Sequence, residues 1–309
     1  MKYIEFGQSK SRVSNVVLGL MRIPELGNGE KVASLVNVAL DNGINMLDIA
    51  DCYTKGKAET LLGDAFEYDK SLRNKVFLQS KCGIVKDPFY YFDFSKKHIL
   101  DAVDASLKRL KTDHLDSLLL HRPDALMEPE EICEAFCSLR SSGKVREFGV
   151  SNFSPAQMKL LQSELDVPLC ADQVQMSICH TVMIDAGFNV NMDNEASVMH
   201  DGGVLEHCRM HDMAVQAWSV MQHGFFKGVF IGDPHYLKLN AALDKIAQKY
   251  GVSATAVAIA WVLRYSGKMQ AVIGTTKEKR VADSAKASEI KLTREEWYEL
   301  YLAAGNDLP

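Results

Sequence analysis

Short, almost continuously apolar runs alternate along the chain with longer stretches in which apolar residues follow helical spacing. The first run, Val16 to Met21, precedes a segment from Glu30 to Leu40 whose apolar residues recur at intervals of three and four. This pattern predicts one strand followed by one helix. Seven further strand-like runs begin near Asn45, Val76, Leu115, Val145, Cys170, Ala214 and Gln270. Nearly all of them are followed by an amphipathic segment of helical length.

Eight repeats of strand and helix favour a closed barrel of parallel strands. The runs are nearly continuous in apolar character, as expected of parallel strands buried on both faces. We therefore expect an α/β fold, a (β/α)8 TIM barrel with an N-terminal hairpin and extra C-terminal helices, as a single domain over residues 1–309. An open doubly wound sheet would give a similar local pattern, but the segment VVLGLMRIPELGNG lacks the G-x-G-x-x-G of a nucleotide-binding sheet.

Helix-boundary residues agree with this periodicity. Ser154 and Pro155 supply a cap and a first-turn proline before AQMKLLQSEL, and Gly43 follows the first predicted helix as a C-cap residue. Two stretches fit the repeat poorly and are predicted to be long loops, 184–203 and 224–236.

Composition narrows the class of partner. The chain carries 35 Lys and Arg against 40 Asp and Glu, a net charge of −5, so no basic surface is expected to hold nucleic acid or an anionic membrane, and a small-molecule partner is expected. The seven cysteines include no C-x-x-C pair and lie mostly in apolar runs, which indicates reduced thiols and a cytoplasmic protein. The segment MKYIEFGQSK lacks the apolar core of a signal peptide, and no apolar run reaches the roughly 18 residues of a membrane span. We expect a monomer or a weak homo-oligomer.

Polar residues follow three successive predicted strands. In a β/α barrel the C-terminal strand ends meet on one face, so these are the positions where chemistry is expected. The second strand ends NMLDIADCY, the third FLQSKCG and the fourth DSLLLHRPD. An acid and a phenol (Asp48 and Tyr53), an amine (Lys81) and an imidazole (His121) should therefore converge. Each alone has an ordinary structural explanation, as a turn cap, a packing aromatic, a surface amine or a hydrogen-bonded core histidine.

Taken together, these four residues resemble the Asp-Tyr-Lys-His tetrad of the aldo-keto reductase family. The resemblance covers nearly the whole chain and includes DIADCY, LKRLKTDHLDSLLLHRPD, GKVREFGVSNFSPAQ and ADQVQMS. Two positions depart from the family pattern. Thr54 replaces the usual glycine after the tetrad tyrosine, and AVIGTTK lacks the proline often found near the end of the eighth strand. The resemblance implies a reductase of aldehydes, ketones or similar carbonyls.

The chemistry of the tetrad can be argued independently. Carbonyl reduction needs a hydride at carbon and a proton at the oxygen, and a phenol such as Tyr53 can donate that proton. The ordinary phenol pKa of about 10 is too high for ready exchange, so we expect the Lys81 ammonium to lower the pKa of Tyr53. Asp48 is the expected counterion of a buried Lys81, and His121 is expected to orient the carbonyl.

The resemblance also implies a nicotinamide site on the fifth to seventh strand ends. Ser151, Asn152 and Gln173 are expected to hold the carboxamide, and Trp218 with Ser219 to stack on or contact the ring. For Trp218 alone, a core aromatic would be the simpler explanation.

A cationic segment follows the eighth predicted strand. In GTTKEKR, the cations Lys277, Lys279 and Arg280 lie in the predicted first turn of a helix, where the macrodipole disfavours positive charge unless an anion is present. A cofactor 2′-phosphate held by Arg280, Lys277 and the hydroxyl of Thr275 or Thr276 would resolve the conflict, as in the family pattern. We therefore expect NADPH/NADP+ rather than NADH. Asp283 either meets the adenine or is a solvated helix charge.

Three further groups of residues suggest additional roles. His207 and His211 have the i, i+4 spacing of zinc ligands, but no further ligand is clearly paired with them, and no metal is expected. Arg22 and Arg122 are expected to flank the mouth of the barrel and could favour a carboxylated substrate, although an ion pair between Arg122 and Asp124 is the simpler alternative. The aromatic run DPFYYFDF suits either a small satellite core or an apolar substrate wall.

Two other functions remain open from the sequence. A non-catalytic NADP-binding regulatory subunit could share this barrel and keep the tetrad. A barrel lyase or metal hydrolase could use Lys81 as a Schiff-base or ligand residue, but it would leave Ser151, Asn152, Gln173 and Trp218 unexplained.

Overall fold

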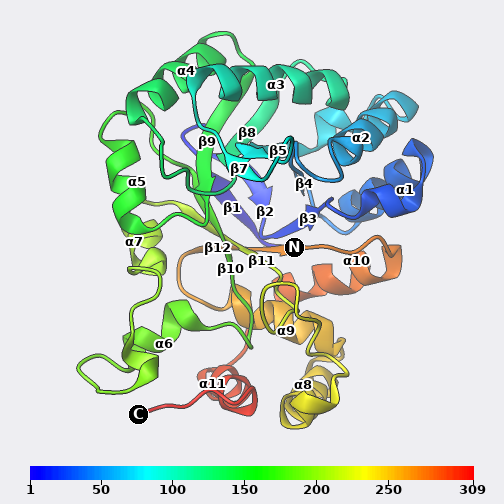
Figure 1. Cartoon of the computed structure of the whole chain (residues 1–309). Helices are drawn as coiled ribbons and strands as arrows, with labels where there is room; N and C mark the ends of the chain where they lie inside the picture. Colours follow the sequence, from blue (N-terminus) through cyan, green and yellow to red (C-terminus); the bar gives the residue numbers. More distant parts are fainter.

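Eight parallel strands close into a barrel in the computed structural model, which describes residues 1–309 (Figure 1). The strands are β3 (Val16–Gly19), β4 (Met46–Asp48), β5 (Phe77–Cys82), β8 (Leu115–Leu120), β9 (Val145–Ser151), β10 (Ala171–Gln175), β11 (Ala214–Trp218) and β12 (Lys268–Ile273). Neighbours in the barrel are neighbours in the chain, and β12 pairs with β3 to close the ring. The eight predicted strands and the closed barrel are confirmed, and the open sheet is wrong.

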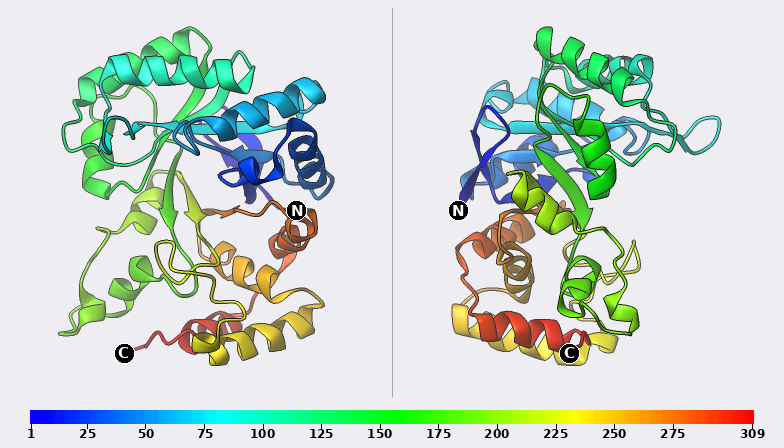
Figure 2. Two further views of the ribbon diagram at one scale, coloured as in Figure 1. Left: turned by 45° about the vertical axis from the view of Figure 1, so that its right-hand side comes forward. Right: turned by 90° about the vertical axis from the view of Figure 1, so that its left-hand side faces the viewer.

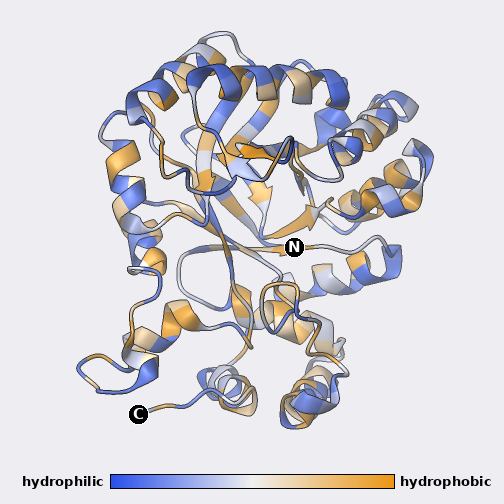
Figure 3. Ribbon diagram, in the orientation of Figure 1, coloured by the Kyte–Doolittle hydropathy of each residue, from blue (hydrophilic) through white to orange (hydrophobic).

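Helices pack around the outside of the barrel and carry hydrophilic residues among hydrophobic ones (Figures 2 and 3). They are α1 (Gly29–Asp41), α2 (Lys57–Tyr68), α3 (Lys96–Leu110), α4 (Pro129–Ser141), α5 (Pro155–Gln162), α6 (Val182–Phe188), α7 (Val204–Met210), α8 (Leu237–Tyr250), α9 (Ala254–Leu263), α10 (Glu278–Ala285) and α11 (Arg294–Ala303). Short 3-10 helices span Ile23–Leu26, Arg73–Lys75, Glu195–Ser197, Pro234–Tyr236 and Lys286–Glu289. Each barrel strand is followed in the chain by at least one α-helix, as the sequence predicted.

Local signals explain where several helices start. Ser154 and Gln157 form a capping box with Pro155 in the first turn of α5, as expected from the sequence. The predicted loop over 184–203 is wrong in part, because its first residues belong to α6. That helix is short, and its buried Met183 and Ile184 pack into the core, so tertiary contacts outweigh a weak local helical pattern.

A hairpin covers one end of the barrel. β1 (Tyr3–Phe6) and β2 (Ser11–Ser14) are antiparallel, which confirms the predicted N-terminal hairpin. Phe6 and Val13 pack against Met46 and Phe77, which lie at or near the first residues of β4 and β5. Phe6 and Phe77 meet edge to face with ring centroids 5.3 Å apart. The N-terminal end of the barrel is therefore filled with apolar side chains, which leaves the C-terminal end for chemistry.

The extra C-terminal helix is also present. α11 lies beside α8 in both views of Figure 2. Trp297 of α11 stacks on Trp261 of α9 with centroids 4.6 Å apart, and each indole donates to the other residue's carbonyl. No single helix is both long and apolar enough to cross a bilayer; residues 234–250 and 254–263 reach that composition only as a pair bent by 92°.

Candidate active site

The four tetrad residues meet at the C-terminal end of the barrel. Lys81 Nζ donates to Asp48 Oδ2 at 2.7 Å, to the carbonyl of Ile49 at 2.8 Å and to Tyr53 Oη at 3.4 Å. The rings of Tyr53 and His121 are 5.7 Å apart and nearly perpendicular. Lys81 and Asp48 are buried, whereas Tyr53 and His121 are partly exposed at the mouth. The predicted convergence, including Asp48 as counterion of Lys81, is present.

A buried glutamine network that the sequence analysis missed holds Asp48 in place. Gln79 and Gln173 each donate an amide hydrogen bond to Asp48 Oδ1, at 2.7 and 2.9 Å. Both also donate to Gln216, which in turn donates to Gln270, so the network spans the inside of the barrel. A signal existed, because each glutamine is a polar residue within a barrel strand that is expected to be buried on both faces. Since all donors of the network are satisfied from within the barrel, Asp48 keeps one orientation toward Lys81.

The protonation state of Tyr53 corrects one expectation. Burial raises the pKa of the Tyr53 phenol to about 12, and the Lys81 ammonium opposes this shift without outweighing it. The expectation that Lys81 would lower the pKa of Tyr53 below its usual value is therefore wrong. Burial also tends to lower the pKa of Lys81, but Asp48 and Tyr53 outweigh it, so the pKa of Lys81 is raised. The site holds a neutral phenol beside a charged amine.

His121 is a neutral imidazole that lies beside a thiol. Burial, helped by the nearby Lys81 and Arg122 charges, holds the pKa of His121 well below its usual range. Cys52 Sγ lies 3.6 Å from His121 Nδ1, and burial raises the pKa of this thiol to about 11, so it remains protonated. With the thiol as donor, Nδ1 accepts and Nε2 carries the ring proton. His121 can thus donate from Nε2 to an oxygen.

Outside the barrel wall, a second buried ionic group joins α2 to β5 and to α3. Glu59 of α2 accepts from Ser80 of β5 at 2.7 Å and from Arg109 of α3 at 2.8 Å. Burial and the Glu59 carboxylate raise the pKa of Asp51 to about 7. These residues were not identified from the sequence, because the partners are far apart in the chain and no local pattern joins them.

Four of the residues expected to hold a nicotinamide are joined by hydrogen bonds next to His121. Ser151 Oγ donates to the backbone carbonyl of Gln173 at 2.7 Å, and Asn152 Nδ2 donates to Ser151 Oγ at 2.8 Å. Trp218 Nε1 donates to Asn152 Oδ1 at 3.1 Å. The side chain of Gln173, by contrast, is 3% exposed and bonded to Asp48 and Gln216 rather than pointing into the mouth.

Several residues of this face adopt left-handed backbone conformations without being glycine. Asn152 has φ of 63° directly after β9, and Ser219 has φ of 55° directly after β11. Thr54 has φ of 50° in the turn after Tyr53, which is a strained conformation for a β-branched residue. Thr54, which replaces the glycine usual in the family, therefore holds a backbone conformation that glycine would adopt without strain.

The cationic segment after β12 lies at the same end of the barrel. Lys277 is the N-cap of α10, one position before the first turn that the sequence analysis assigned to it, and Arg280 lies within that turn. Both cations are exposed and make no ion pair, while Thr275 Oγ1 accepts from the backbone of Lys277 at 3.2 Å and Thr276 is half-buried. Asp283 pairs with Lys286 at 3.4 Å, as expected of a helix charge.

Residues 15–301 match the model of the Aldo/keto reductase family. The chain belongs to the aldo/keto reductase family. It is 36% identical to the 6-dehydroglucose reductase of Agrobacterium fabrum, with 97% of each chain aligned, and 33% identical to the oxidoreductase YdhF of Escherichia coli, with 96% of this chain and 95% of that protein aligned. Among solved structures, an aldo-keto reductase from Klebsiella pneumoniae in complex with NADPH superposes with a TM-score of 0.77 at 25% identity, covering 99% of this chain and 96% of the other. The predicted family and its oxidoreductase class are confirmed.

Beside the tetrad of this aldo/keto reductase, Arg122 makes no ion pair with Asp124. The Asp124 carboxylate accepts instead from the backbone N–H groups of Phe94 and Leu126. The Arg122 guanidinium lies 5.8 Å from the ring centres of both Trp218 and Phe225. The predicted alternative, an ion pair between Arg122 and Asp124, is therefore wrong. No carboxylate pairs with the Arg122 charge at the mouth.

The aromatic run after the third barrel strand forms an exposed hairpin. β6 (Ile84–Val85) pairs with β7 (Tyr91–Phe92), and Phe89 and Tyr90 are 67% and 60% exposed at its tip. It is therefore not a satellite core. Arg22 precedes the 3-10 helix after β3 and is exposed.

The zinc interpretation of the histidine pair finds no support. The rings of His207 and His211 are 4.4 Å apart, but Cys208 points into the core and no third ligand atom completes a metal-binding group with them.

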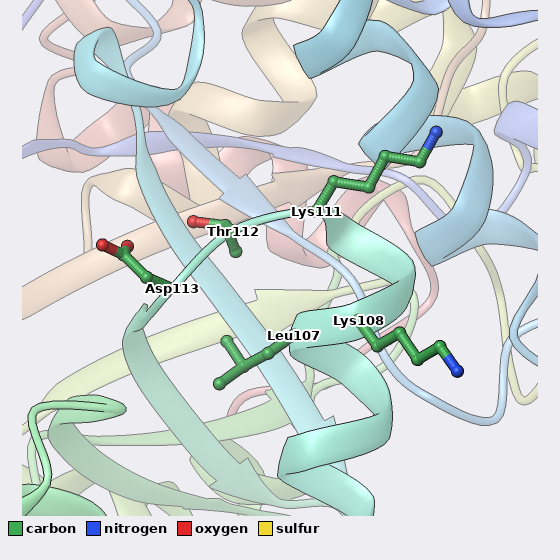
Figure 4. Close-up of a pocket in the computed structure, with 5 residues that line it drawn as sticks. All are labelled: Leu107, Lys108, Lys111, Thr112 and Asp113. Atoms are coloured by element: carbon green, nitrogen blue, oxygen red, sulfur yellow. The ribbon is translucent and has the colours of Figure 1, made fainter.

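A shallow surface depression lies away from the tetrad (Figure 4). It is lined by Leu107, Lys108, Lys111, Thr112 and Asp113, where α3 ends and before β8 begins. This is the N-terminal end of the barrel strands, opposite the end that bears the tetrad. Its position excludes a direct role in the tetrad chemistry.

Proposed function

We propose that this aldo/keto reductase reduces an aldehyde or ketone with NADPH and that Tyr53 is the proton donor. The observation that carries the proposal is the contact of Tyr53 Oη with Lys81 Nζ at 3.4 Å, beside the donor-capable Nε2 of His121. Carbonyl reduction is the general reaction of the family. The Klebsiella relative in complex with NADPH supports the choice of cofactor.

The residues present fit this cofactor. NADPH would supply the hydride, with Ser151 and Asn152 near its carboxamide and Trp218 with Ser219 near its ring. The side chain of Gln173, which the sequence analysis also assigned to the carboxamide, is held by Asp48 and Gln216 instead. The unpaired cations at the start of α10 suit a 2′-phosphate, together with the hydroxyls of Thr275 and Thr276, because anions are stabilised at a helix N-terminus.

The chain's own residues would handle the proton. His121 donates from Nε2 to the carbonyl oxygen and orients it, and Tyr53 gives its proton to the same oxygen as negative charge develops there. The Lys81 ammonium stabilises the phenolate left on Tyr53, and Asp48 keeps that ammonium in place at 2.7 Å. Regaining the proton from solvent through the partly open mouth completes the cycle.

The substrate we propose is a small polar carbonyl compound, with a sugar aldehyde as the first choice. Two relatives, from Agrobacterium fabrum and Novosphingobium aromaticivorans, are named 6-dehydroglucose reductases and are 36% and 34% identical to this chain. The free guanidinium of Arg122 can donate to a substrate hydroxyl or carboxylate. We also propose that residues 1–309 act as one unit; the cytoplasmic location and the monomeric or weakly oligomeric state stay predictions.

The function is tested by following NADPH oxidation with a panel of carbonyls: 6-dehydroglucose, a carboxylated aldehyde, a simple ketone and a quinone. Turnover of at least one compound, dependent on Tyr53, is the expected result. Tight NADPH binding without turnover of any of them would contradict the catalytic proposal and favour the regulatory alternative.

The pH dependence of reduction follows from the raised pKa of Tyr53. A proton donor acts while protonated, so its contribution is present below its pKa and lost as pH rises through it. With that pKa at about 12, kcat/KM for the carbonyl should stay flat from about pH 6 to about pH 9. The measurement is a pH profile at saturating NADPH in buffer containing EDTA. A fall with an apparent pKa below about 9 would show that another group donates the proton.

The preference for NADPH depends on the free cations of α10. Replacing Arg280 with Leu should weaken NADPH binding about tenfold or more and leave NADH binding unchanged, because only NADPH carries the 2′-phosphate. Fluorescence titration of both nucleotides measures this. Lys286→Leu, at the C-cap of α10 and paired with Asp283, is the matched control and should change neither affinity. Equal losses for both nucleotides in Arg280→Leu would place the 2′-phosphate elsewhere.

A further inference from the structure

Three metal-ligating side chains meet beside the tetrad, and only one of them has a part in the proposed reduction. Asp51 and Cys52 lie in the turn after β4, and His121 directly follows β8. One ligand atom of each lies within 4.8 Å of the other two. Cys52 Sγ and His121 Nδ1 are 3.6 Å apart.

The separation of sulfur and nitrogen is that of two ligands of one tetrahedral zinc ion. Bonds of about 2.3 Å to sulfur and about 2.0–2.1 Å to nitrogen, at a tetrahedral angle, place the two ligand atoms about 3.5 Å apart. A cation can therefore bind both without moving either element of the barrel. One carboxylate oxygen of Asp51 lies within 4.8 Å of both atoms, so rotation of this side chain can bring a third ligand to the same cation.

The carboxylate and the thiol lack other partners. Asp51 Oδ1 is buried without any hydrogen-bond partner, a state that costs free energy unless something binds there. Cys52 Sγ contacts only His121 among polar groups. A thiolate and a carboxylate together carry two negative charges, which a divalent cation neutralises. The opposing charges are Lys81, which is paired with Asp48, Arg109, which is paired with Glu59, Arg122, and Lys86, whose Nζ donates to the backbone carbonyl of Cys52 at 3.2 Å.

We propose that Asp51, Cys52 and His121 form a three-ligand site for a thiophilic divalent cation such as Zn²⁺, with the fourth position open at the mouth of the barrel. Mixed S, N and O ligands with an open position suit zinc rather than magnesium or calcium. The metal replaces the thiol proton on binding, and that proton goes to solvent. The proposed reduction itself has no step that uses a metal ion, so the prediction that reduction needs no metal is unchanged.

A cation bound at this site is expected to inhibit carbonyl reduction. This inhibition rests on the proposed function, whereas cation binding itself does not. The cation would lie on His121 Nδ1, in place of the Cys52 thiol proton. The ring of Tyr53 is 5.7 Å from the imidazole of His121. The bound cation would therefore place a positive charge, and the open coordination position of the metal, next to Tyr53. A carbonyl compound approaching Tyr53 would then meet the metal and its bound water.

The test is titration of the full-length protein with Co²⁺, read by the thiolate-to-cobalt absorption band in the near ultraviolet. Cys133 and Cys137 form a second group with Asp166, so both cysteines are first changed to Ser. In that background we expect one Co²⁺ per chain with a thiolate band, displaced by stoichiometric Zn²⁺. Cys52→Ser should lose the band, and Asp51→Asn should weaken binding.

Cys179→Ser is the matched control, since this thiol is half-buried and outside the cluster, and the band should persist in it. Cys52→Val serves if the Ser variant unfolds, with thermal unfolding followed for every variant. Absence of the band in the Cys133→Ser/Cys137→Ser background, or its persistence without Cys52, overturns the site. Binding at the site with undiminished NADPH oxidation by Zn²⁺-loaded protein overturns its inhibitory role alone.

Discussion

Replacing Tyr53 with Phe should lower kcat/KM for carbonyl reduction by about 10²- to 10⁴-fold, the contribution typical of a positioned general acid. The phenol oxygen is the only atom removed, and its one hydrogen-bond partner is Lys81 Nζ at 3.4 Å. The edge-to-face contact with His121 survives in the variant. The loss should therefore fall on kcat, while the Kd for NADPH stays within about twofold, because Tyr53 is not among the residues proposed to bind the nucleotide.

Steady-state rates with the best substrate of the panel, together with fluorescence titration of NADPH, measure both quantities. Tyr68→Phe is the matched control: it also removes a phenol oxygen, but from an exposed residue of α2 bonded to Glu30, and it should keep full activity. Retention of more than about a tenth of wild-type kcat/KM in Tyr53→Phe would remove the tyrosine from the role of proton donor.

The barrel could be predicted because its signals are local and repeated. Each buried parallel strand is a short apolar run, and each helix has its own periodicity. Once the sheet closes into a barrel, the order of the strand-like runs along the chain, from Val16 to Gln270, gives the order of the strands around it. The tetrad followed from the same rule. Asp48, Lys81 and His121 are polar residues at or after strand ends, and all strand ends of a parallel barrel lie on one face.

The rest of the site depends on which partners the side chains bind, and no local sequence pattern predicts these partners. Gln79 and Lys81 share one face of β5 because they are two residues apart, but their joint attachment to Asp48 depends on how β5 pairs with β4. The unpaired charge of Arg122 could not be predicted either, because its expected partner, Asp124, accepts instead from backbone amides of its own loop and of the segment before α3.

The misjudged pKa of Tyr53 has a related cause. The sequence shows that a cation will be near, but the cost of burying a phenolate depends on how many atoms surround it, and this larger effect raises the pKa to about 12. The neutral phenol suits a proton donor, since the reacting form is then the abundant one near neutral pH. Thr54 makes the same point for the backbone: its strained φ of 50° was visible only in the structure.

Replacing Lys81 with Met should both abolish reduction and destabilise the protein by about 3–5 kcal/mol, because it leaves the Asp48 carboxylate buried without its cation. Gln79 and Gln173 still donate to that carboxylate, which places the expected loss nearer the lower value. The free energy of unfolding from denaturant titration measures the effect. Lys245→Met, which breaks an exposed pair with Glu299, is the control and should cost less than about 1 kcal/mol.

A double variant separates the structural role of the buried pair from its catalytic one. In Lys81→Met with Asp48→Asn, the uncompensated charge is gone, and the amide of Asn can still accept from the glutamines, so most of the lost stability should return. Activity should not return, because nothing then stabilises the phenolate that Tyr53 must form. Recovery of reduction along with stability would mean that Lys81 acts only through folding, and its assignment as the group that stabilises the phenolate would be withdrawn.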